Sequence, residues 1–67
     1  MLRIEIERED DGRWIGEVPA LPGVLAYGAT AAEARGRVSA LALRVVADRL
    51  EHGEPVPSEA QDWFAAA

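Results

Sequence analysis

The stretch Trp14–Ala34, WIGEVPALPGVLAYGATAAEA, decides how this chain folds. It begins with the alternation of a strand, and then Pro19 and Pro22 remove two backbone donors and interrupt any ladder. Further along, Thr30 precedes Glu33 by three residues and an apolar run follows, which is the capping-box pattern of a helix N-terminus. The stretch therefore predicts a strand, a proline-containing turn, a short strand and the start of a helix.

Strands are expected on both sides of these prolines. Residues 1–8 alternate apolar and charged side chains, which is the pattern of a strand with one buried face. A second strand should cover 13–18, and a short third strand over 24–27 should run antiparallel to it.

The pairing of the first two strands follows from the alternation. A two-residue turn would place Ile6 opposite Glu17 and would mix the apolar and charged faces. A three-residue loop over 10–12, with its glycine in the left-handed region, instead places Ile6 opposite Gly16. We therefore expect the three-residue loop, which also puts Glu5 directly opposite Glu17.

Like charges that face each other across a ladder are destabilising. The Glu5–Glu17 pair is therefore expected to be screened in one of two ways. Either the neighbouring Arg3 and Arg13 supply the positive charge, or a cation of a partner does.

The helix that Thr30 caps should run to about Glu51, and Gly53 should end it. Its apolar side consists of Ala34, Val38, Leu41, Ala42 and Val45. The apolar arc is then widened by Leu43, Val46, Ala47 and Leu50. A helix this apolar is expected to be covered on more than one side, and a second subunit is one candidate for the additional cover.

The segment 58–67 allows two interpretations. Ser58 could cap a short helix, because Gln61 stands at the capping-box position. Alternatively, residues 62–66 could add a short strand beside the first strand. In both cases Trp63 and Phe64 are expected to dock on the body of the protein.

The composition limits the class of protein. A chain of 67 residues makes a single domain, 1–67, whose core is small. It has no cysteine, so no disulfide can stabilise this core. A homodimer or a higher oligomer is therefore expected. No run of residues is apolar and long enough to span a membrane, and we expect a cytoplasmic protein.

The net charge of −5 disfavours direct binding to DNA or RNA and suits a basic protein partner. Ordinary solubility explains the same charge equally well. The acidic residues expected to contact such a partner lie on the first two strands and in the turn between them: Glu5, Glu7, Asp10, Asp11 and Glu17.

No arrangement of residues indicates catalysis. Ser39 stands mid-helix. The single His52 stands near the helix C-terminus, where the helix dipole favours a cation. A metal-dependent nuclease using Glu5, Glu17 and Asp48 is a third hypothesis, but nothing in the sequence supports it. We expect a protein that is not an enzyme and that uses no cofactor and no metal.

The order of the turn and cap residues resembles the HicB-like antitoxin family, over about Ile4 to Pro57. The residues that carry the resemblance are Asp11-Gly12 with Trp14, Glu17-Val18-Pro19, Leu21-Pro22-Gly23, Gly28, Thr30, Glu33-Ala34 and Gly53-Glu54-Pro55-Val56-Pro57-Ser58. Each of these signals is weak by itself, and their combination in this order is specific.

The resemblance implies an α+β fold of two layers, with an antiparallel sheet of three or four strands in the order β-β-β-α-β and one long helix packed on it. This is a degenerate form of the RNase H-like fold. It also implies that the protein binds and neutralises a small basic mRNA interferase, a HicA-type toxin. Because the chain ends at Ala67, we expect a short form that lacks the C-terminal DNA-binding domain of many members. The alternative is a stand-alone homo-oligomeric domain that has no toxin.

Overall fold

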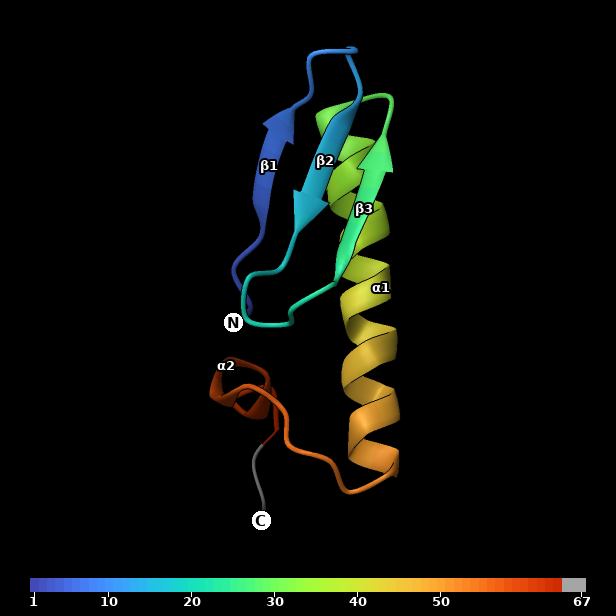
Figure 1. Cartoon of the computed structure of the whole chain (residues 1–67). Coiled ribbons are helices and arrows are strands. Elements are labelled where there is room, and N and C mark those ends of the chain that lie inside the picture. Colours follow the sequence, from blue (N-terminus) through green and yellow to red (C-terminus); the bar gives the residue numbers. More distant parts are fainter. Residues whose placement is uncertain (65–67) are drawn as a thin grey trace.

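The protein folds as a three-stranded antiparallel sheet with one long helix packed on one face (Figure 1). The structure is a computed structural model, and it describes residues 1–64. Its elements are β1 (Glu5–Arg8), β2 (Trp14–Glu17), β3 (Leu25–Gly28), α1 (Ala31–Glu51) and α2 (Ser58–Gln61). The predicted two-layer α+β class is confirmed, and β2 is the central strand.

The predicted pairing of β1 with β2 is confirmed. Glu5 pairs with Glu17 and Ile6 with Gly16. The turn closes as a three-residue loop, because the Glu9 carbonyl accepts from the Gly12 N–H at 2.9 Å and Gly12 has a φ of 90°. The strand itself is shorter than the alternation suggested, since the ladder begins at Glu5 and residues 1–4 precede it.

The proline-containing connection is a compact turn with a buried side chain. The Val24 N–H donates to the Leu21 carbonyl at 3.0 Å across Pro22 and Gly23, and Gly23 has a φ of 87°. A proline followed by a glycine with positive φ is the pattern of a type II turn. Leu21 is fully buried, so this turn contributes one of the largest side chains of the core.

The ends of α1 are fixed as the sequence indicates. The Thr30 hydroxyl accepts from the Glu33 N–H at 3.0 Å, and the Glu33 carboxylate in turn lies 3.4 Å from the Ala29 nitrogen. At the other end the Glu54 N–H donates to the Arg49 carbonyl at 2.8 Å, and Gly53 has a φ of 67°. This is a Schellman termination.

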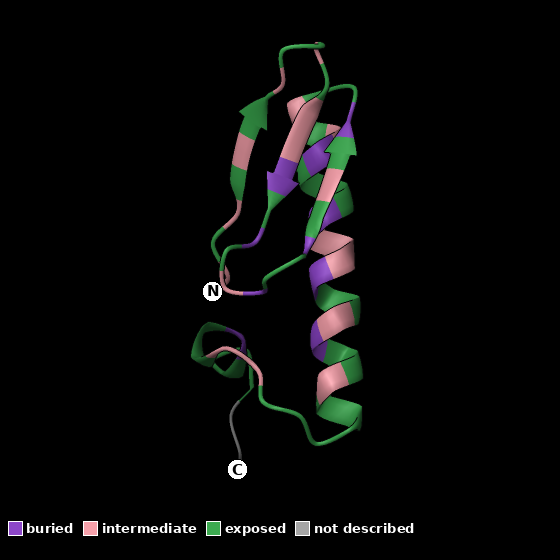
Figure 2. Ribbon diagram, in the orientation of Figure 1, coloured by how far each residue is buried: buried purple, intermediate pink, exposed green. Residues whose placement is uncertain are grey.

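The core lies between the helix and the inner face of the sheet, which carries the even-numbered residues of the strands. Its members are small and aliphatic: Val18, Leu21, Val24, Ala34, Val38, Ala42, Val46 and Ala60. Within α1 the buried residues recur every four positions, which gives a narrow contact along one side of the helix (Figure 2). The C-terminal half of α1 extends beyond the ends of the strands (Figure 1).

The rest of the apolar arc of α1 is only partly covered in the part of the chain that the structure describes. Leu43 is 54% exposed and Leu50 is 51% exposed, while Leu41 is half-buried. Gly36 is also exposed, and a methyl group added there would meet no other part of the chain within 4 Å.

The segment after α1 forms a short helix and not a fourth strand. In α2 the N-cap residue is Pro57, and the Ser58 hydroxyl contacts Glu59 instead of the backbone. Ala60 is buried in the core, which fixes this helix below the sheet. The strand expected over 62–66 is absent from 62–64, and its last two positions lie outside the described residues. Trp63 docks in part, but Phe64 is 71% exposed.

Candidate functional site

The outer face of the sheet, opposite to α1, carries the odd-numbered residues of all three strands. It presents Glu5 and Glu7 from β1, with Glu17 from β2, and all three are exposed. Asp10 and Asp11 lie in the turn at the end of this hairpin, and both are exposed. The five acids proposed from the sequence therefore belong to one hairpin.

Glu9 and Ile15 join these acids, although the sequence analysis did not select them. Together with Glu5, Glu7 and Glu17 they line a hollow of about 230 Å³ on the outer face. Ile15 lies opposite Glu7 and belongs to the outer side of β2. Its apolar side chain thus lines the same hollow as four carboxylates, and the alternation of β2 was the available signal for this position.

The third strand adds apolar surface to the same face. Leu25 lies opposite Glu17, and Tyr27 lies opposite Ile15. Leu25 is 40% exposed and Tyr27 is 36% exposed. The outer face, defined here by Glu5, Glu7, Glu9, Ile15, Glu17, Leu25 and Tyr27, combines acidic groups at one side with an apolar strip at the other.

The facing carboxylates of Glu5 and Glu17 are neutralised unequally. Arg3 reaches Glu5 at 2.9 Å, and both side chains remain exposed. Arg13 does not screen Glu17, because its Nε pairs with Asp11 at 2.7 Å. Within residues 1–64, Glu7, Glu9 and Glu17 have no intramolecular ion pair. Their charges are therefore available to an external cation.

Asp11 holds the end of the hairpin together. Its carboxylate accepts from the Arg13 N–H at 3.0 Å and from the Arg13 guanidinium at 2.7 Å. The backbone bond, followed by the side-chain bond, lowers the pKa of Asp11 from its ordinary value. The guanidinium also stacks on the Tyr27 ring, 4.4 Å from its centre. Asp11 thus orients an arginine and a tyrosine beside the acidic groups.

The carboxylates named for a nuclease are not brought together. Asp48 belongs to α1, whereas Glu5 and Glu17 are on the face of the sheet that α1 does not cover. Across residues 1–64, no three acidic or histidine side chains are placed to hold a metal ion. His52 contacts the Asp48 carbonyl one turn back, and Ser39 donates to the Arg35 carbonyl. Both side chains therefore have local helical roles.

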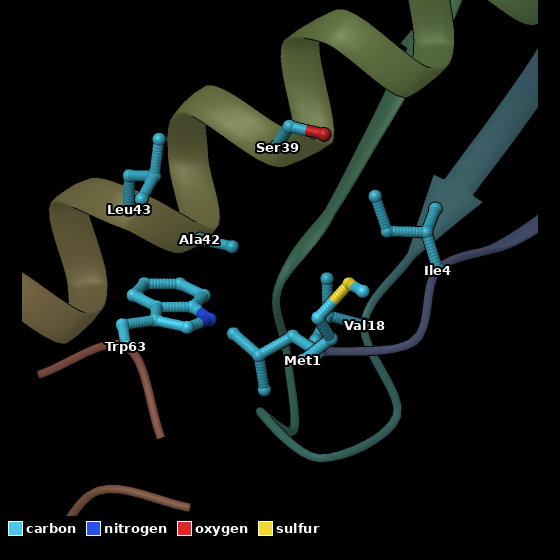
Figure 3. A pocket seen from close by; sticks show the side chains of 8 residues that line it. Met1, Ile4, Val18, Ser39, Ala42, Leu43 and Trp63 are labelled. Atoms are coloured by element: carbon cyan, nitrogen blue, oxygen red, sulfur yellow. The ribbon is translucent and has the colours of Figure 1, made fainter. Parts of the chain in front are cut away.

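A second hollow lies between the sheet and the helix, beside the start of the chain (Figure 3). Its volume is about 240 Å³ and its lining is apolar apart from Ser39. Trp63 forms one wall and Leu43 the next, and Met1 lies across from them.

The comparisons with known proteins found no matching family model, no similar curated protein and no similar solved structure. In the described part of the chain, α1 is not apolar enough, and α2 is too short, to cross a membrane. The candidate site is the outer face, on which four carboxylates and an isoleucine line one hollow.

Proposed function

We propose that this protein is a HicB-like antitoxin, which binds a small basic mRNA interferase of the HicA type through the outer face of its sheet. The observation that carries the proposal is the group of four carboxylates that line one hollow with Ile15. Only Glu5 among them has an ion pair within residues 1–64. A sheet face whose own charges repel one another is stabilised when a cationic surface covers it.

The composition of the outer face suits a protein partner better than a small cation. Carboxylates form paired hydrogen bonds with arginine side chains. Ile15, Leu25 and Tyr27 add apolar area that a protein surface can bury, and a tyrosine with an adjacent arginine is typical of the energetically important part of an interface. The activity of the toxin is then inhibited if the bound sheet covers its active site.

The alternative is a stand-alone homo-oligomeric domain that has no toxin. Its support is the exposed apolar side of α1, where Leu43 and Leu50 are each about half exposed. A gene for a short basic protein next to the gene of this chain favours the antitoxin, and the lack of such a neighbour favours the alternative.

Co-purification tests the proposal directly. The full chain is co-expressed with the neighbouring basic protein, and the affinity of the purified pair is measured at low and high salt. We expect a tight complex that weakens steeply with salt, and ribonuclease activity of the basic protein that the chain suppresses. A partner that is not a ribonuclease, or one that is not inhibited, would contradict the antitoxin assignment.

Two variants with the same net charge locate the binding surface. Glu7→Gln combined with Glu17→Gln changes the outer face, and Glu51→Gln combined with Glu54→Gln changes exposed acids elsewhere. We expect the first pair to weaken binding about tenfold or more and the second to change it little. Equal losses of affinity in the two double variants would show that binding depends only on the total charge of the chain. The outer face would then not be the binding surface.

A further inference from the structure

The two edges of the sheet differ in how the chain protects them. At the β3 edge, Nη1 of Arg37 donates to the Tyr27 carbonyl at 3.0 Å. Glu33 holds the same guanidinium at 2.8 Å, so α1 blocks part of this edge. At the β1 edge, no other segment of residues 1–64 forms a backbone hydrogen bond with Ile4, Ile6 or Arg8.

The ladder determines which groups of β1 are free. The Glu9 N–H donates to the Arg13 carbonyl at 2.7 Å, which makes these two residues a hydrogen-bonded pair. Bonded and non-bonded pairs alternate along antiparallel strands, so Glu5 and Glu7 direct their backbone groups towards β2. Ile4 and Ile6 direct theirs away from the sheet. An incoming strand can bond to these groups.

The charges of β1 select one pairing with a second copy of itself. When Ile4 lies opposite Ile4 of the partner subunit, Arg3 lies opposite Glu5 of the partner subunit, and two-fold symmetry repeats the contact. A shift of two residues one way places Arg3 opposite Glu7 of the partner subunit, but it also places Glu5 opposite Glu5 of the partner subunit. The shift the other way places Arg3 opposite Arg3 of the partner subunit. Shifts by one residue would exchange the two faces.

The inner side of this pairing is apolar. Leu2 would lie opposite Ile6 of the partner subunit, next to the central pair of isoleucines. Leu2 and Ile4 also line the apolar hollow shown in Figure 3, and Met1, which lines it with them, is 89% exposed. A second strand along β1 would therefore add apolar contacts beside side chains that one copy leaves partly open.

We propose that two copies of this chain associate through β1 in this antiparallel pairing, so that their sheets join into one continuous sheet of six strands. Residues 2–4 extend β1 in the dimer. Apart from Glu5, which pairs with Arg3 of the partner subunit, the outer faces of both copies stay accessible, and the dimer therefore does not depend on the antitoxin function.

Exchange of the two charges tests the pairing without any toxin. The Arg3→Glu variant places like charges opposite each other in the dimer, and so does the Glu5→Arg variant. In a mixture of the two variants, each introduced charge lies opposite its complement. We expect a wild-type dimer, a dimer Kd about ten- to a hundredfold higher for each variant alone, and a mixed dimer when they are combined. Sedimentation velocity measures all three, with native mass spectrometry to identify the mixed species.

In each variant the side chains at positions 3 and 5 of one chain carry like charges, and mixing the variants does not change this. A dimer that forms only in the mixture therefore reports the contact between subunits and not the Arg3–Glu5 pair within one chain. A wild-type chain that remains monomeric up to millimolar concentration would overturn the proposal. So would single variants that dimerise as well as the wild type, or a mixture that stays monomeric.

Amide exchange in the wild-type protein gives a second measurement that needs no variant. The amides of Leu2, Ile4 and Ile6 should become protected as concentration rises, because each donates across the new ladder. The Arg8 amide points to the same side but lies beyond the overlap, and it should keep exchanging rapidly. Protection that is independent of concentration, or equal at Arg8, would contradict the pairing.

Discussion

Gly28 of β3 and Ala34 of α1 approach so closely that a methyl group on Gly28 would lie 2.5 Å from the Ala34 backbone nitrogen. The Glu33 carbonyl carbon would be 3.0 Å away. These are backbone atoms of the first turn of the helix, so no side-chain rotation can make room. Gly28 therefore allows the capped end of α1 to rest on the end of β3.

The Gly28→Ala variant should be destabilised by about 1–3 kcal/mol, because the first turn of α1 must move away from the sheet. Urea unfolding followed by circular dichroism measures the loss. An unchanged unfolding midpoint would mean that the helix start is placed more loosely than the structure has it.

Gly36→Ala provides the matched substitution in an open position. Beyond its own stretch of helix, no atom lies within 4 Å of the new methyl group, and the residue is in the interior of α1. The change should stabilise the protein by about 0.5–1 kcal/mol, because alanine favours the helix more than glycine does. Chemical unfolding measures the gain. A loss of stability would indicate that a second subunit packs closely against Gly36.

The narrow buried side of α1 predicts unequal effects of two truncations. Val38 is fully buried, so Val38→Ala should cost about 2 kcal/mol of unfolding free energy. Leu50 is half exposed, and Leu50→Ala should cost less than about 1 kcal/mol although it removes more carbon atoms. The reverse order, measured by chemical unfolding, would contradict the orientation of the helix.

The Asp11–Arg13 contact predicts a pH dependence with a definite sign. The pKa of Asp11 is lowered in the folded state, so folding favours the carboxylate. Its contribution is complete above the ordinary value of 3.8 and is lost as the pH falls through the lower folded value. Unfolding midpoints of wild type and Asp11→Asn should therefore differ at neutral pH and converge in acid. A difference that grows with acidity would disprove this role.

The facing glutamates predict a stability gain from removing one charge. Glu17→Gln should stabilise the isolated protein by about 0.2–1 kcal/mol at low salt, because Glu5 loses a like charge opposite to it. The gain should disappear in high salt. Thermal unfolding at two salt concentrations measures it. Glu5→Gln should gain less, because it also removes the Arg3 ion pair.

The sequence predicted the features that depend on neighbours along the chain. The pairing of β1 with β2 followed from the alternation, and the start of α1 followed from Thr30 and Glu33. Both are local rules, and the structure confirms them.

The features that the sequence did not predict depend on contacts between distant segments. Leu21 reads as a turn residue, and only the packing of the turn under the sheet shows that it is fully buried. Leu25 and Tyr27 join the acidic surface through the pairing of β2 with β3, whose register could not be derived from the sequence. The segment after Pro57 is too short for its pattern to separate helix from strand.

Arg37 also determines how far a β1-mediated association could grow. Its hydrogen bond to Tyr27 occupies part of the far edge of each sheet, so a joined pair presents two partly blocked borders to solvent. Addition of a third copy would first require both the Tyr27 bond and the Glu33 ion pair to break. A small chain whose sheet has one open edge, at β1, would thereby form a closed dimer and would not grow into a fibril.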